Sequence, residues 1–240
     1  MAQTGMYILD RFHPGANFNM PLAYLVEGPL EKEKVETVFR SLIERHEALR
    51  TTFGVHNGEP VQLIHPRVDF HPTYMETSEE HLPGLLSGFF QPFDLLSPPL
   101  IRVGMVRLTD EKHLLLIDMH HLIADGYSLN LLMKEFLQLY RGDSLPGLRI
   151  QYKDYAVWQR DFLISENFKV QEKYWRERFA DGIPALNLPV DFPRRLGEKS
   201  APGEVKTLLS ATEGKQLQQL ALSNKASLHM VVFAIYALFL

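Results

Sequence analysis

Two adjacent histidines precede an acidic residue and a glycine in the segment His120-His121-Leu122-Ile123-Ala124-Asp125-Gly126. An imidazole can exchange a proton near neutral pH, because its ordinary pKa is about 6.5. A carboxylate can fix the local geometry, and a glycine has no Cβ, so the N–H of Gly126 can approach a ligand closely. A base or orienting imidazole, a carboxylate and an amide that meets an oxyanion together suit acyl transfer.

The residues before this segment predict a β-strand, which limits what the two histidines can do together. The run Leu114-Leu115-Leu116-Ile117 is apolar on both faces, as in a covered, central strand. Side chains alternate across a strand, so His121 shares a face with Met119 while His120 shares the opposite face with Asp118. Only one of the two histidines can therefore be the working group.

Two other interpretations of the segment compete with acyl transfer. A histidine at a strand end is more often structural than catalytic, and a short motif with three free positions also occurs by chance. If the segment were helical, His121 and Asp125 would face the same way and could ligate zinc with His120 nearby. The strand pattern and Gly126 argue against that helix, and no third convergent ligand is evident, so we expect no metal site.

The remaining pattern predicts a mixed α/β chain in which helices and strands alternate. Gly126 is expected to break the central strand, and Ser128 to cap the helix that follows it. An apolar stripe formed by Val35, Val38, Phe39, Leu42, Ile43 and His46 predicts a helix, and Asn57-Gly58 predicts a hairpin turn between 49–55 and 61–64. Helices are expected at 82–90, 128–140, 152–163, 168–179, 212–224 and 227–240, further strands at 100–108, 113–119 and 205–210, and a loop at 93–99.

Composition excludes several classes of protein and of site. Net charge is -4, so no basic field favours nucleic acid. The chain has no cysteine, which excludes disulfides, thiolate metal sites and a cysteine nucleophile, and makes a reducing cytoplasm the expected compartment. The longest apolar run, 231–240, is well short of the ~20 residues that span a bilayer, so we expect no membrane insertion.

Five segments occur in the order found in the condensation domains of nonribosomal peptide synthetases, which this chain resembles. They are Ala2-Gln3 with Met6-Tyr7-Ile8-Leu9, Arg45-His46-Glu47-Ala48-Leu49-Arg50-Thr51-Thr52-Phe53, His120-His121-x-x-x-Asp125-Gly126-x-Ser128, Tyr152-x-Asp154-Tyr155-x-x-Trp158-Gln159 and Leu188-Pro189-x-Asp191-x-Pro193-Arg194. One departure is Gly5, where the family's opening motif usually has an arginine. The double histidine excludes the cyclisation domains, which have aspartates there.

The resemblance implies two chloramphenicol-acetyltransferase-like lobes, each a mixed sheet packed with helices, with a tunnel between them. No cofactor would bind directly. Donor and acceptor peptidyl carrier domains would present their substrates as thioesters on 4'-phosphopantetheine, beside an adenylation domain of the same synthetase. The acceptor amine would attack the donor thioester and form an amide in antibiotic or other secondary-metabolite biosynthesis.

The resemblance also implies roles for individual residues. His121 matches the family's catalytic position, as a base or as a group that positions the amine or the tetrahedral intermediate. Asp125 would pair with an arginine. For His120, strand alternation rather than the resemblance predicts a role, which is to shape the strand end. For Arg45 and Arg50, a buried structural pair and solvent-facing charges both stay open. We expect Tyr155 and Trp158 to be core or interface aromatics.

We expect three regions along the chain and keep three functional hypotheses. The regions are an amino-terminal lobe over 1–183, a connector over 184–202, and over 203–240 the first elements of a second lobe that continues beyond the sequence. In the first hypothesis the chain is part of an active condensation domain and inactive alone. In the second it is a non-catalytic lobe or interaction module. In the third it is a relative, such as an acyltransferase that uses coenzyme A or an epimerisation domain.

Overall fold

The computed structural model describes residues 2–12, 18–183, 185, 188, 191–192, 203 and 205–240. The chain forms two compact units, Met1–Lys173 and Tyr174–Leu240, and each is described here by itself. The predicted connector, 184–202, lies largely outside the described residues. The candidate site belongs entirely to the first unit.

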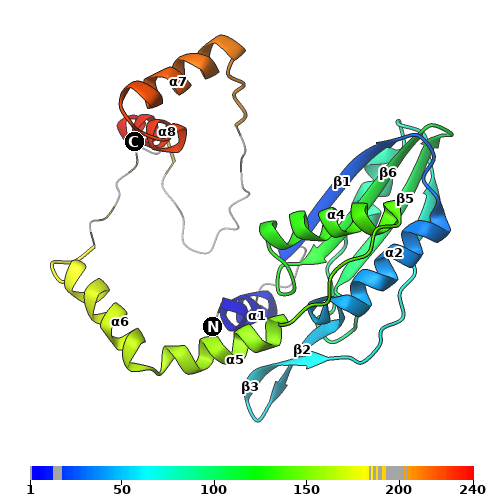
Figure 1. The fold of residues 1–240 in the computed structure, drawn as a ribbon, viewed down its shortest axis with the longest axis horizontal. Coiled ribbons are helices and arrows are strands. Elements are labelled where there is room, and N and C mark those ends of the chain that lie inside the picture. The colour runs from blue at the N-terminus through cyan, green and yellow to red at the C-terminus, as the bar shows by residue number, and fades with distance from the viewer. Residues whose placement is uncertain are drawn as a thin grey trace. The chain divides into compact units, whose positions relative to one another are not determined.

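A four-stranded sheet forms the framework of the first unit (Figure 1). Its order is β1 (Asn19–Glu27), β6 (Lys112–His120), β5 (Ile101–Thr109) and β4 (Thr73–Glu76), with β1, β6 and β5 antiparallel and β4 parallel to β5. The prediction of a covered, central strand is confirmed for β6, which pairs on both sides and buries Leu115, Leu116 and Ile117.

Two helices, α2 (Lys32–Arg45) and α4 (Gly126–Arg141), lie side by side on one face of this sheet (Figure 1). The apolar stripe of α2 is buried as predicted, although His46 lies just beyond the end of the helix. The helix α4 ends at Gly142, whose φ of 93° places it in the left-handed region that favours glycine. The core between the helices and the sheet includes Phe39, Leu42, Leu129, Phe136, Met105, Leu115, Ile117 and Met119.

A hairpin and a short helix extend from the end of α2 toward the candidate site. The 3-10 helix η2 (Glu47–Arg50) leads into β2 (Thr51–His56) and β3 (Glu59–Ile64), with Asn57 and Gly58 at φ 51° and 81° in the turn, as predicted. Leu49 lies in η2 rather than in the strand, because its N–H bonds back to His46 O and its side chain is buried in the core. The amino-terminal helix is α1 (Ala2–Phe12).

On the other face of the sheet, α3 (Leu82–Phe89) and the loop that follows it pack against β5, and both elements were predicted from the sequence. Gly104 in β5 permits this packing. A Cβ on Gly104 would lie 2.7 Å from the ring of Phe89, too close for any other residue without a shift.

The remaining helices are α5 (Tyr152–Leu163), α6 (Glu166–Arg178), α7 (Ala211–Ser223) and α8 (Leu228–Phe239), each close to its predicted range. The strand predicted at 205–210 is wrong. Val205 and Leu208 are 95% and 96% exposed, and no strand of the described part lies beside them to bond their backbone groups. Ser210 instead caps α7 in a reciprocal capping box with Glu213.

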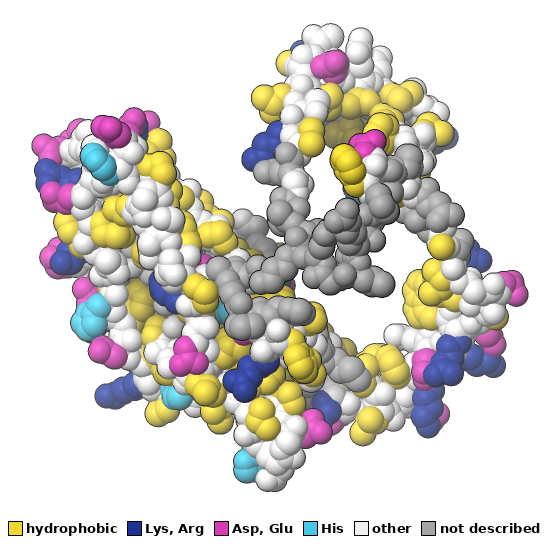
Figure 2. Space-filling view, turned by 180° about the vertical axis from the view of Figure 1, so that it is seen from behind, with side chains coloured by type: hydrophobic (Ala, Val, Ile, Leu, Met, Phe, Trp, Pro, Cys, Tyr) yellow, Lys and Arg dark blue, Asp and Glu magenta, His cyan; other side chains and the backbone are white. Residues whose placement is uncertain are grey.

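Apolar side chains remain exposed on α8, including Phe233, Leu238 and Phe239, and Figure 2 shows hydrophobic side chains gathered over the α7–α8 pair. Within the described ranges, no single helix is long and apolar enough to cross a membrane. Only α7 and α8 taken together have the length and apolar composition of a membrane-spanning segment, and the two helices are bent by 102° at the break between them.

Candidate active site

The site is built where β6 ends and α4 begins. The strand ends at His120, residues 121–125 form a turn and an extended cap, and α4 begins at Gly126 rather than near Ser128. Gly126 therefore starts a helix instead of breaking the strand. The zinc hypothesis required His121 and Asp125 to lie one turn apart on the same face of a helix. The structure does not have this arrangement, because residues 121–125 are not helical.

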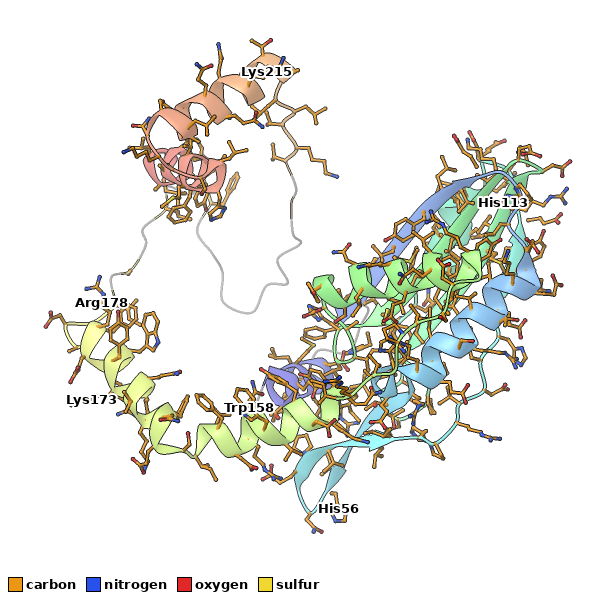
Figure 3. The ribbon with its side chains drawn as sticks, in the orientation of Figure 1. His56, His113, Trp158, Lys173, Arg178 and Lys215 are labelled. Atoms are coloured by element: carbon orange, nitrogen blue, oxygen red, sulfur yellow. The ribbon has the colours of Figure 1, made fainter. Side chains whose placement is uncertain are left out.

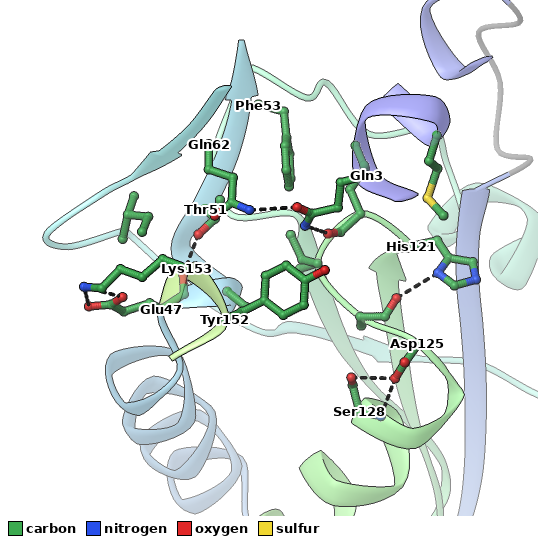
Figure 4. Close-up of a pocket in the computed structure, with 16 residues that line it drawn as sticks. Gln3, Glu47, Thr51, Phe53, Gln62, His121, Asp125, Ser128, Tyr152 and Lys153 are labelled. Atoms are coloured by element: carbon green, nitrogen blue, oxygen red, sulfur yellow. Dashed lines mark hydrogen bonds and ion pairs between the residues drawn. The ribbon is translucent and has the colours of Figure 1, made fainter. Parts of the chain in front are cut away.

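The side chain of His121 is exposed at the wall of a pocket (Figure 4). Its Nδ1 lies 2.8 Å from the carbonyl oxygen of Ala124. A carbonyl can only accept a hydrogen bond, so Nδ1 donates and carries the proton of the neutral ring. The lone pair is then on Nε2, the nitrogen with which His121 can accept a proton from a ligand.

The side chain of His120 lies in the opposite environment. It is 2% exposed, and its Nδ1 accepts a hydrogen bond of 3.1 Å from the N–H of Leu122. Its Nε2 lies 3.6 Å from Asp10 Oδ1, too far for a hydrogen bond, and forms no hydrogen bond with any described residue. Burial lowers the pKa of His120. The role expected for this residue from strand alternation, to shape the strand end, stays a prediction.

The pocket beside His121 has a volume of about 250 Å³ and is formed within the first unit. It is bounded by α1, the hairpin, the turn after β6 and the start of α5, elements that are far apart in the sequence (Figure 4). Its polar lining residues are Gln3, Glu47, Thr51, Gln62, His121, Asp125, Ser128, Tyr152 and Lys153. Apolar side chains, among them Met6, Phe53, Ile64 and Ile123, complete the wall.

Sequence reasoning missed several residues of this wall. Gln3 donates from Nε2 to Leu122 O at 2.7 Å, and Gln62 donates from Nε2 to Gln3 Oε1 at 2.7 Å. Lys153 pairs with Glu47 at 2.8 Å. The family resemblance includes Gln3 only as part of the opening motif, and no local sequence signal indicates a role for Gln62. Their contacts join residues that are 119 and 59 positions apart in the chain.

The structure places Asp125 differently from the expected ion pair with an arginine. Asp125 is the N-cap of α4, and its Oδ1 accepts from the backbone N–H of Ser128 at 2.8 Å and from its hydroxyl at 2.6 Å. These two hydrogen bonds lower the pKa of Asp125. Among the described residues no arginine pairs with it, because the carboxylate turns toward the helix end. It also lines the pocket, whereas Gly126 does not.

Arg45 and Arg50 are largely buried and hold structural contacts, which decides between the two alternatives left open for them. Arg45 pairs with Glu135 at 3.3 Å and is 15% exposed. Arg50 donates to His65 O at 2.5 Å, lies 3.6 Å from Glu47 and is 16% exposed. The core alternative for Tyr155 and Trp158 is wrong: Trp158, labelled on α5 in Figure 3, is 56% exposed and Tyr155 is 45% exposed.

A buried acid lies on the same strand face as His120. Asp118 has no exposed side-chain surface, and its Oδ2 accepts from Asn19 at 2.6 Å and from Arg102 at 3.1 Å. Burial raises the pKa of Asp118 to about 6, a larger effect than the opposing one of Asn19 and Arg102. This cluster adjoins the turn, because Phe18, the residue before Asn19, accepts the backbone N–H of His121 at 2.8 Å.

Comparison with known proteins gives consistent results for the whole chain. The family model described as a condensation domain matches residues 1–240. The chain is 49% identical over 241 residues to tyrocidine synthase 3 of Brevibacillus parabrevis, covering 98% of this chain and 4% of that protein. It is 46% identical to gramicidin S synthase 2 of Aneurinibacillus migulanus, covering 98% of this chain and 5% of that protein.

Solved structures share the fold. The X-domain of teicoplanin biosynthesis in complex with OxyB has a TM-score of 0.80 and 26% identity, covering 94% of this chain and 52% of that chain. The first condensation domain of the CDA synthetase has a TM-score of 0.79 and 20% identity, covering 99% of this chain and 59% of that chain. The chain thus spans about half the length of these two solved relatives.

Proposed function

This chain belongs to the condensation-domain family of nonribosomal peptide synthetases, and we propose that it supplies the amino-terminal half of a domain that forms peptide bonds. The observation that carries the proposal is the state of His121. Its Nδ1 proton is held by Ala124 O, and no described residue forms a hydrogen bond with Nε2 at the wall of the pocket. An acceptor at this position suits a reaction in which an amine loses a proton.

The proposed reaction joins two carrier-bound substrates. The neutral α-amine of the acceptor attacks the carbonyl carbon of the donor thioester, and a tetrahedral intermediate forms. Nε2 of His121 takes a proton from the attacking nitrogen as the C–N bond forms. The C–S bond then breaks, the electron pair leaves with sulfur, and that proton ends on the released thiol.

His121 has a modest chemical task in this proposal. A thioester is already activated, and an α-amine with a pKa of about 7.7–8.0 is partly neutral at working pH. Holding the two substrates in line therefore supplies much of the acceleration. The backbone N–H of Gly126, at the start of α4, stays a proposed contact for the oxyanion. A Cβ at position 126 would have no neighbouring atom within 4 Å, so packing does not require a glycine there.

We further propose the partners that this reaction needs. Donor and acceptor peptidyl carrier domains would present the thioesters on 4'-phosphopantetheine, next to an adenylation domain. The support is that the matched relatives are large synthetases of which this chain covers only 4–5%. Because the chain spans 52% and 59% of two solved relatives, we propose that the 240 residues alone do not catalyse condensation.

The test compares the chain, extended to the length of its solved relatives, with a His121→Ala variant of the same length. Both carrier partners are loaded, and dipeptidyl thioester is measured by mass spectrometry. We expect the variant to be slower by about 10²-fold, the lower end of the usual contribution of a general base, because alignment of the substrates supplies much of the acceleration. His56→Ala is the matched control, because His56 is exposed at the hairpin tip (Figure 3). A His121→Ala rate equal to that control contradicts the assignment.

One observation favours a second candidate function, a protein-binding module without catalysis. A relative with 26% identity and a TM-score of 0.80, the X-domain of teicoplanin biosynthesis, was solved in a complex with OxyB. The same assay separates the two functions. If the extended wild-type chain makes no dipeptidyl thioester although both carriers are loaded, the binding module becomes the better hypothesis.

A further inference from the structure

Two backbone groups of the turn that carries His121 form hydrogen bonds with residues that are far away in the sequence. The N–H of His121 bonds to Phe18 O at 2.8 Å, a backbone contact across the chain, whereas the N–H of Ile123 bonds locally to His120 O at 3.0 Å. The carbonyl of Leu122 instead receives the Nε2 donor of Gln3 in α1. Gln3 in turn accepts a hydrogen bond from Gln62 in β3, so two side-chain amides join three separate elements (Figure 4).

The direction of this chain of hydrogen bonds is determined by its last member. A backbone carbonyl can only accept, so Gln3 must present Nε2 to Leu122 and Oε1 to Gln62. Gln62 must then present its own Nε2 as the donor. Reversing either amide would place two oxygens against each other. Only a group that both accepts and donates can occupy the middle position.

We propose that Gln3 and Gln62 are positioning residues for His121, an inference that rests on the function proposed above. Leu122 directly follows His121, and its buried side chain fixes the peptide unit whose carbonyl Gln3 holds. Ala124, whose carbonyl holds Nδ1 of His121, is two residues further on. A shift of the Leu122 carbonyl therefore moves both the backbone of His121 and the acceptor that orients its ring.

The main test uses opposite changes at Gln62 in the extended, loaded domain. Gln62→Glu removes the donor and places a carboxylate against Gln3 Oε1, whereas Gln62→Lys keeps a donor toward Gln3. We expect Gln62→Glu to lower kcat by about 10- to 100-fold with KM unchanged, because small misplacements of a reacting group are costly. Gln62→Lys should recover most of that kcat. A Gln3→Glu variant should resemble Gln62→Glu, because both changes cut the same chain of hydrogen bonds.

The matched control is Gln91→Glu. Gln91 is exposed, and its Nε2 donates to Ser87 O at 2.7 Å, so the change removes a similar amide donor away from His121. The proposal is overturned if Gln62→Glu has the kcat of Gln91→Glu, or if Gln62→Lys is as slow as Gln62→Glu. It is also overturned if KM rises at constant kcat, because these side chains would then contact substrate instead.

A second readout does not depend on condensation. In the ¹⁵N-labelled 240-residue chain, NMR reports which nitrogen of His121 carries the proton. We expect a single Nδ1–H form in the unaltered chain and in Gln62→Lys, and a mixture of both tautomers in Gln62→Glu. A lack of condensation by the unaltered extended domain would contradict only the proposed function. An unchanged tautomer in Gln62→Glu would overturn the positioning role.

Discussion

His120 and His121 are adjacent in the chain, yet the structure gives them opposite states. His120 is 2% exposed, uses Nδ1 as an acceptor and keeps its proton on Nε2, which forms no hydrogen bond within the described part of the chain. His121 is exposed at the pocket and uses Nδ1 as a donor, and no residue that the structure describes bonds to its Nε2. The same side chain is thus a packing element on one side of the strand end and a candidate proton acceptor on the other.

The difference shows how a β-strand assigns roles to neighbouring residues. Alternation places His120 with Asp118 under α3 and its loop, and the strand ends before His121 is covered in the same way. Which nitrogen carries the proton then depends on one backbone group for each ring, the N–H of Leu122 for His120 and the carbonyl of Ala124 for His121. Residue type alone contains none of this information.

The largest expected effect separates the two histidines by stability. His120→Ala removes a ring packed near Phe18 and Phe93, with centroid distances of 6.1 and 6.2 Å, and leaves a cavity. We expect the free energy of unfolding to fall by about 2–4 kcal/mol, as for other large-to-small changes in a core. His121→Ala, at an exposed position, should change it by less than about 0.5 kcal/mol. Urea unfolding of the 240-residue chain measures both values.

A His120→Gln variant serves as the conservative control, because its amide can accept from the N–H of Leu122. It should be less destabilising than His120→Ala. Equal losses of stability for His120→Ala and His121→Ala would remove the contrast between a buried and an exposed histidine.

A smaller effect concerns the buried side of the strand and depends on pH. The native pKa of Asp118 is about 6, above its ordinary value of 3.8, because burial disfavours the charged form. Between these pH values the native state binds a proton that the unfolded chain releases, so the contribution of Asp118 to stability falls as pH rises from about 4 to about 6. Asp118→Asn cannot titrate. Relative to Asp118→Asn, the unaltered chain should lose about 2 kcal/mol of unfolding free energy between about pH 4.5 and about pH 7.5.

Paired urea titrations of the unaltered chain and Asp118→Asn at the two pH values check this expectation. Asp154→Asn is the control for a change of acid to amide near the surface, since Asp154 lies in the exposed first turn of α5. A stability difference between the unaltered chain and Asp118→Asn that grows with pH would mean that Arg102 and Asn19 outweigh burial.

Much of the framework could be predicted because its signals are local. The apolar spacing in α2, the two-sided apolar run in β6 and the turn at Asn57-Gly58 each determine an element within a few residues. The motif around His121 was also local, and alternation separated the two histidines. The strand expected at 205–210 failed for the same reason, because a local pattern does not supply the neighbouring strand that a β-strand needs.

The rest of the site depends on contacts between distant residues. Neither the pairing of Asp118 with Arg102 nor the contact of Gln3 with Leu122 can be predicted before the register of β5 against β6 and the position of α1 are known. Asp125 is a different case, because the sequence does contain a signal for its role as an N-cap. An aspartate directly before a helix and three residues before Ser128 is a strong N-cap, whereas the family resemblance favoured an ion pair.

The smallest expected effect concerns this cap, which lies between the two histidines and α4. Asp125→Ala removes the acceptor of the N–H and hydroxyl of Ser128, and should lower the free energy of unfolding by about 1 kcal/mol. Asp125→Asn should retain most of the stability, because asparagine is an equally good cap. If an ion pair were the main role, Asp125→Asn would instead lower the free energy of unfolding as much as Asp125→Ala does. Added salt would then lower the free energy of unfolding of the unaltered chain until it approached that of both variants. Urea unfolding at low and high salt therefore decides whether Asp125 acts on α4 through its cap geometry or through its charge.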